Sequence, residues 1–91
     1  MSDTGCLRVV VHGLVQGVFF RDSVRRRASS AGVSGWVRNN PDGTVEAVFE
    51  GEQGAVDRLV DFCREGPRGA RVDRIEVYEE EPEGLAAFRI S

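Results

Sequence analysis

Apolar residues recur along the chain with two different spacings, and each change of spacing marks the start of a new element. In the run 7–12 every second residue is strongly apolar, which predicts a strand with one apolar face (Leu7, Val9, Val11). From Phe20 onward the apolar residues are instead four, four and three apart, which predicts an amphipathic helix (Phe20, Val24, Ala28, Ala31). Gly32 ends that helix, as a C-terminal cap does.

A β-hairpin and a second helix follow. Residues 33–39 predict a strand, 40–43 (Asn-Pro-Asp-Gly) form a strong turn signal, and 44–50 alternate between inward and outward positions. The expected inward residues of the second hairpin strand are Val45, Ala47 and Phe49, and Gly51 closes that strand. Four apolar residues at helical spacing then predict a helix that stops near Gly66-Pro67 (Val56, Leu59, Val60, Cys63).

Two shorter strands remain in the last third of the chain. Ile75 and Val77 alternate in a fourth strand, whereas Val72 is out of phase with them and is expected in the preceding loop or in a bulge. Phe88 and Ile90 predict a short fifth strand, and the acidic run 79–83 is expected to be a solvated hairpin or loop.

The element order β-α-β-β-α-β, with one extra terminal strand, predicts a ferredoxin-like α+β sandwich: an antiparallel sheet with two helices on one face. We expect a single domain over 6–91 after a flexible N-terminus of residues 1–5. In this topology the first two strands run parallel with the third between them, so their C-terminal ends share one edge about 10 Å apart. The loop 13–20 leaves the first strand at that edge, and Asn39 ends the second strand there.

The stretch 13–21 (Gly-Leu-Val-Gln-Gly-Val-Phe-Phe-Arg) has the features of an anion site. A glycine-bearing loop that enters a helix gathers backbone N–H groups beside the positive end of the helix dipole, and Arg21 can grip two oxygens. The stretch is not a nucleotide-binding Walker A loop, which needs a Lys-Ser/Thr pair after its second glycine. We therefore expect a phosphate to bind the loop amides of six consecutive residues (Val15, Gln16, Gly17, Val18, Phe19, Phe20).

The residues around this site restrict its chemistry. Asn39 offers a donor and an acceptor that suit it to hold an attacking water, but the chain has no lysine, no carboxylate pair, no metal cluster, and only His12, on a strand. Such a site can stabilise a transferring phosphoryl group but cannot easily protonate a poor leaving group. The substrate should bring a good leaving group, as an acyl phosphate does with its carboxylate.

Composition excludes several other classes. A net charge of −3 argues against polyanion binding by bulk charge, and the outer positions of the third strand (Thr44, Glu46, Val48, Glu50) repel phosphate and offer no base stacking, which argues against an RNA-binding sheet. No run of about 20 apolar residues and no signal pattern is present, so we expect a cytoplasmic protein with no membrane partner. Cys6 and Cys63 match no metal or redox spacing, and we expect reduced thiols, with a disulfide as the alternative.

The segments 13–21 and 35–46 closely resemble the two signature blocks of the acylphosphatase family, and Gly66-Pro67 with Ala70 and the terminal Phe88 and Ile90 resemble further family features. This resemblance covers essentially the whole chain. It implies a small monomeric enzyme that hydrolyses acyl phosphates without metal or cofactor. It also implies that Arg21 binds the phosphate together with the loop amides, and that Asn39 orients the attacking water.

Plainer interpretations remain open for the same residues. Arg21 can be a solvated residue at a helix start, Asn39 can serve an Asx-turn, and Gln16 can brace the loop or point at solvent. The alternative function is a non-catalytic module of the same fold that binds small anions without turnover.

Overall fold

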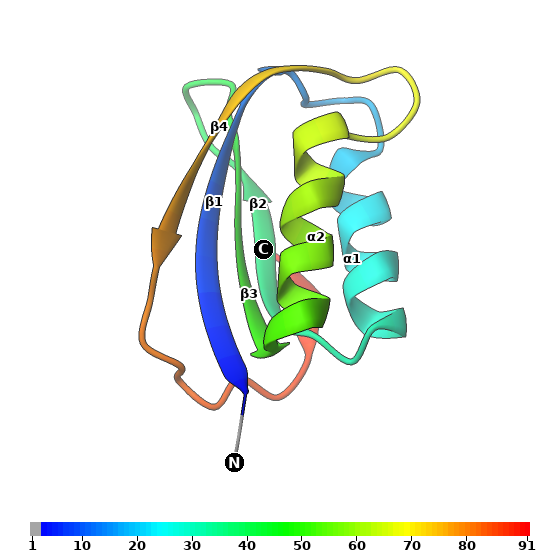
Figure 1. The fold of residues 1–91 in the computed structure, drawn as a ribbon. Coiled ribbons are helices and arrows are strands. Elements are labelled where there is room, and N and C mark those ends of the chain that lie inside the picture. Colours follow the sequence, from blue (N-terminus) through cyan, green and yellow to red (C-terminus); the bar gives the residue numbers. More distant parts are fainter. Residues whose placement is uncertain (1–2) are drawn as a thin grey trace.

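Seven elements make up the computed structural model, which describes residues 3–91 (Figure 1). In chain order they are β1 (Thr4–Leu14), α1 (Phe20–Ser30), β2 (Ser34–Asn39), β3 (Val45–Glu52), α2 (Gln53–Glu65), β4 (Arg71–Glu79) and β5 (Phe88–Ile90). Thr4 already pairs with Glu52, so the first strand begins earlier than the apolar pattern alone indicated. Residues 1–2 of the expected flexible terminus lie outside the described residues. No helix of the described chain is long and apolar enough to cross a membrane.

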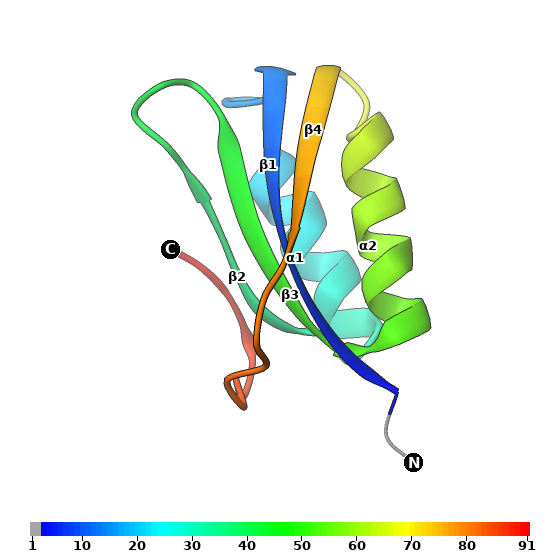
Figure 2. The same cartoon turned by 60° about the vertical axis from the view of Figure 1, so that its left-hand side comes forward.

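The sheet confirms the predicted ferredoxin-like arrangement. Its strand order is β4-β1-β3-β2-β5, and β3 is antiparallel to both β1 and β2, so β1 and β2 run parallel with β3 between them. One pairing departs from the expected antiparallel sheet: β5 is parallel to β2, with Val37 opposite Ile90. After β4 the chain crosses to the opposite edge before it pairs, and it arrives there in the direction of β2 (Figure 2).

Both helices cover the same face of the sheet, and the core lies between the two layers (Figures 1 and 2). Three of the four residues in the predicted apolar stripe of α1 are buried (Phe20, Val24, Ala28). The fourth, Ala31, is instead the exposed residue that caps the end of the helix. The helix α2 buries five residues on one side (Ala55, Val56, Leu59, Val60, Cys63). Val45, Ala47 and Phe49 meet them from β3, and Phe49 stacks on Phe88 of β5 with ring centroids 5.7 Å apart.

The outer positions of β3 differ from the solvated face that alternation alone suggests. Glu46 and Glu50 are each only 8% exposed. Glu46 accepts hydrogen bonds from Arg8 at 3.1 Å and Arg38 at 3.0 Å, and Glu50 accepts three backbone N–H groups of residues 83–85. These carboxylates therefore hold the sheet and the segment before β5 together.

A β-bulge explains the phase of Val72. In the pairing of β1 with β4, His12 lies opposite Arg74 and Gly13 lies opposite Val72, which leaves Asp73 as the extra residue. Gly13 adopts a φ of 137°, and a Cβ there would collide with the carbonyl oxygen of Arg71. The first glycine of the stretch 13–21 is thus required by close backbone contact at the point where β1 ends.

Candidate active site

The loop between β1 and α1 lies at the end of the sheet where the β2–β3 hairpin also turns (Figure 1). Val15 anchors this loop because its side chain is fully buried in the core. Two loop residues adopt left-handed backbone conformations, Gly17 with φ 75° and Phe19 with φ 59°. In proteins, left-handed residues that alternate with right-handed ones can turn successive N–H groups toward one side and form an anion-binding concavity.

The start of α1 adds further free donors to the same place. The first turn is closed by the N–H of Ser23, which donates to the carbonyl of Phe19 at 3.0 Å. The N–H groups before Ser23 have no intrahelical acceptor, and no side chain caps them. The positive end of the helix dipole lies at the same place, and such helix ends attract anions.

One open cavity of about 270 Å³ gathers most of the predicted site residues. Six of the predicted site residues line it (Val15, Gly17, Phe19, Phe20, Arg21, Asn39). Asp22 and Ile90, which were not predicted, line it as well. Gln16 and Val18 do not line it. The topology thus brings Asn39 to Arg21 across 18 positions of sequence, as the parallel arrangement of β1 and β2 requires.

Arg21 is half-buried at this cavity and makes no hydrogen bond or ion pair with any residue of the described chain. The nearby carboxylate of Asp22 is engaged by Arg25 at 3.3 Å and Arg26 at 3.1 Å, so it does not neutralise Arg21. A guanidinium beside a helix N-terminus is electrostatically unfavourable without an anion to balance it. The guanidinium of Arg21 is therefore available to a ligand in the cavity.

Asn39, at the end of β2, has an unsatisfied polar atom. Its Oδ1 is buried and has no hydrogen-bond partner among residues 3–91. A buried polar atom without a partner costs about 1–3 kcal/mol, so such atoms are rare unless a water or ligand satisfies them. The Asx-turn of the hairpin is made instead by Asp42, which accepts from the N–H of Thr44 at 3.0 Å.

Gln16 braces the loop rather than pointing at solvent. Its side-chain amide donates to the backbone carbonyls of Asn40 at 2.8 Å and Thr44 at 3.0 Å. These two bonds join the β1–α1 loop to the hairpin that carries Asn39. The sequence could not decide this because both acceptors lie at least 24 positions away.

A carboxylate on the open face of the sheet supports the same hairpin. Burial by itself would raise the pKa of Glu46, but hydrogen bonds from Arg38, Asn40 and Arg8 outweigh it and lower the pKa. Glu46 is therefore ionised at neutral pH and fixes the side chain of Asn40, the residue after Asn39. Alternation along the strand places Glu46 on this face but cannot indicate which arginines reach it.

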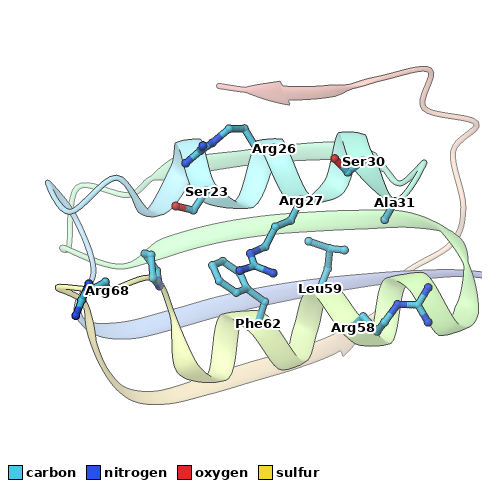
Figure 3. Close-up of a pocket in the computed structure, with 10 residues that line it drawn as sticks. Ser23, Arg26, Arg27, Ser30, Ala31, Arg58, Leu59, Phe62 and Arg68 are labelled. Carbon is cyan, nitrogen blue, oxygen red and sulfur yellow. The ribbon is translucent and has the colours of Figure 1, made fainter.

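A larger groove of about 620 Å³ lies elsewhere, between α1 and α2 (Figure 3). Figure 3 shows Arg27 reaching from α1 toward α2, where its guanidinium lies 4.0 Å from the ring centroid of Phe62. None of the predicted site residues lines this groove. Within residues 3–91, no group of three or more His, Cys, Asp or Glu could hold a metal ion.

Known proteins share both the sequence and the fold of this chain. The family model described as "Acylphosphatase" matches residues 7–90. A protein of Rubrobacter xylanophilus named acylphosphatase is 68% identical over 80 residues, which cover 88% of this chain and 73% of that protein. An acylphosphatase structure from Coxiella burnetii superposes with a TM-score of 0.93 at 39% identity and covers 98% of this chain and 94% of its own. One from Bacillus subtilis gives 0.90 at 37% identity, with 94% and 97% covered. The chain therefore belongs to the acylphosphatase family.

Proposed function

We propose that this protein hydrolyses the carboxyl–phosphate bond of acyl phosphates by binding the phosphoryl group in the loop 15–20 with Arg21 and orienting a water with Asn39. The observation that carries the proposal is the shared cavity, which four of the six loop residues line together with Arg21 and Asn39. The Oδ1 of Asn39 has no hydrogen-bond partner within the described residues. Family membership supports acyl phosphate hydrolysis in general.

In the proposed step, the phosphoryl oxygens accept hydrogen bonds from the loop N–H groups and from Arg21. The water donates one hydrogen bond to Oδ1 of Asn39, which aims an oxygen lone pair at phosphorus. As the new P–O bond forms, the bond from phosphorus to the carboxyl oxygen breaks, and the carboxylate leaves with the electron pair. Because no histidine or carboxylate pair lines the cavity, one proton of the water passes to a phosphoryl oxygen and the other stays on the attacking oxygen, giving dihydrogen phosphate.

The main contribution of the site is electrostatic. Negative charge spreads over the equatorial oxygens in the transition state of phosphoryl transfer, and fixed donors stabilise it without reorganising. The carboxylate needs no proton when it leaves, which is why the site can work without a general acid. We also propose that the protein acts as a cytoplasmic monomer on a small-molecule substrate, without nucleic acid.

Phosphate release from benzoyl phosphate, measured with chelator present, tests this function. We expect turnover by the purified protein and a loss of about 10²–10³-fold for Arg21→Ala, the scale of removing one preorganised charge-stabilising group. Arg64→Ala is the matched control, because Arg64 is an exposed arginine of α2 that pairs with the exposed Asp61 and does not line the cavity. Binding of inorganic phosphate without any turnover would favour the non-catalytic module, and full activity of Arg21→Ala would overturn the site.

A further inference from the structure

Two apolar side chains at the cavity remain unused by the phosphoryl chemistry. Among its apolar lining residues, Val15 and Phe20 are buried in the core and offer the cavity little side-chain surface. Phe19 and Ile90 are different, because they are 80% and 41% exposed. They are the large hydrophobic residues of the described chain that both line this cavity and meet solvent.

Phe19 is a poor choice for its backbone position. It is the only non-glycine residue with positive φ in the described chain, and it precedes α1 without capping it through its side chain. Glycine or asparagine adopts this left-handed conformation more readily than an aromatic residue. Phe19 is 80% exposed and its ring makes no aromatic pair within residues 3–91, so packing does little to offset the strain. Backbone strain of this kind is typical of functional sites.

The position of Phe19 suits it to contact the part of the substrate that the loop does not hold. A phosphoryl group bound by the loop amides and Arg21 fills the polar side of the cavity. The acyl group then extends away from the phosphoryl group, and the exposed apolar surface that this cavity offers it comes from Phe19 and Ile90. An aromatic acyl group can stack on the ring of Phe19, whereas an acetyl group presents a single methyl.

We propose that Phe19 and Ile90, which line the same cavity, form the acyl subsite and give the protein a preference for acyl phosphates with aromatic acyl groups. This inference rests on the proposed function, since it assumes that the phosphoryl group occupies the loop. It assigns Phe19 a role through its side chain, which is separate from the role of its backbone N–H in binding phosphate.

The test compares kcat/KM for benzoyl phosphate with kcat/KM for acetyl phosphate, using the ratio of the two. Both substrates present the same phosphoryl group, and both release a carboxylate. Damage to the phosphate loop therefore lowers kcat/KM for both substrates, and this common loss cancels in the ratio. We expect Phe19→Ala to lower the ratio about three- to tenfold, Ile90→Ala to lower it less, and Phe19→Tyr to retain it. Phe19→Asn should lower the ratio while raising Tm, because asparagine fits the left-handed backbone better.

Leu14→Ala is the matched control. Leu14 is exposed and apolar in the same stretch but does not line the cavity, so the ratio should not change. An unchanged ratio in both Phe19→Ala and Ile90→Ala, even with lower absolute rates, would overturn the acyl subsite while leaving the proposed function intact. Failure of the unmodified protein to hydrolyse either substrate would overturn the proposed function and this inference with it.

Discussion

At the scale of single residues, Asn39 is the most informative position, because a structural role and a catalytic role predict opposite effects of Asn39→Ala on stability and on kcat. Its buried Oδ1 has no partner in the described chain, so it contributes no hydrogen bond to the fold. We expect Asn39→Ala to lower kcat by about 10²-fold, the scale of losing one preorganised polar group. The free energy of unfolding should stay the same or rise slightly, because an unsatisfied buried group is removed.

The inhibition constant of inorganic phosphate separates the two roles of Asn39. The loop and Arg21 remain in Asn39→Ala, so inorganic phosphate should inhibit with an unchanged constant. Asn39→Asp keeps the shape but places a carboxylate beside the bound anion, and it should weaken phosphate inhibition. If phosphate inhibition weakens in Asn39→Ala as much as turnover falls, Asn39 supports the loop structure rather than a water.

At the scale of elements, the proposed catalytic groups belong to two segments that Gln16 joins. Arg21 and the loop follow β1, whereas Asn39 ends β2, and the two hydrogen bonds of the Gln16 amide reach the hairpin after Asn39. We expect Gln16→Ala to raise KM and lower kcat together, about tenfold in kcat/KM, because the loop loses its fixed distance from Asn39. The cost in unfolding free energy should be about 1–2 kcal/mol for two half-buried hydrogen bonds.

Gln53→Ala provides the control for Gln16→Ala. Gln53 lies at the start of α2 and its amide donates to the exposed Asp57 at 2.9 Å, far from the cavity. Steady-state kinetics of both variants give KM and kcat, and urea denaturation gives their free energies of unfolding. Equal kinetics for Gln16→Ala and the unmodified protein would show that the hairpin holds its position without this bridge.

The elements also mark where sequence reasoning succeeds and where it stops. The spacing of apolar residues alone predicts both helices and the succession of strands along the chain. The buried stripe of α1 (Phe20, Val24, Ala28), for example, depends only on local spacing. Such spacing cannot predict partners that depend on tertiary position. The pairing of β5 with β2, the ion pair of Arg8 with Glu46 and the bridge from Gln16 all join residues far apart in sequence.

The candidate site follows the same division. Arg21 and the loop are recognisable from their local sequence, and topology adds Asn39 because parallel strands share an edge. Ile90 could not be assigned to the cavity without knowing that the last strand lies beside β2. The left-handed conformation of Phe19 is equally invisible to the pattern, because nothing in the residue type favours it.

At the scale of the whole molecule, a single core predicts that the domain unfolds as one unit, and Cys63 can report that event. Cys63 is fully buried in the core from α2, is not in a disulfide, and burial raises its pKa to about 12. Thiol reagents need an accessible thiolate, so Cys63 should react only when the core opens. Cys6 is also buried, but it lies on β1 outside the main core cluster. The substitution Cys6→Ser removes its contribution to the labelling signal.

In Cys6→Ser at pH 8, we expect Cys63 to react with a disulfide reagent at least about 10³-fold more slowly than in the unfolded chain, as a cooperative domain requires. The labelling rate should rise with urea in step with the loss of helix signal, because both then report the same global transition. Labelling that is independent of urea below the transition would mean that α2 opens on its own. In that case the two helices would unfold independently, and α1 with the loop that lines the cavity would stay folded while α2 opens.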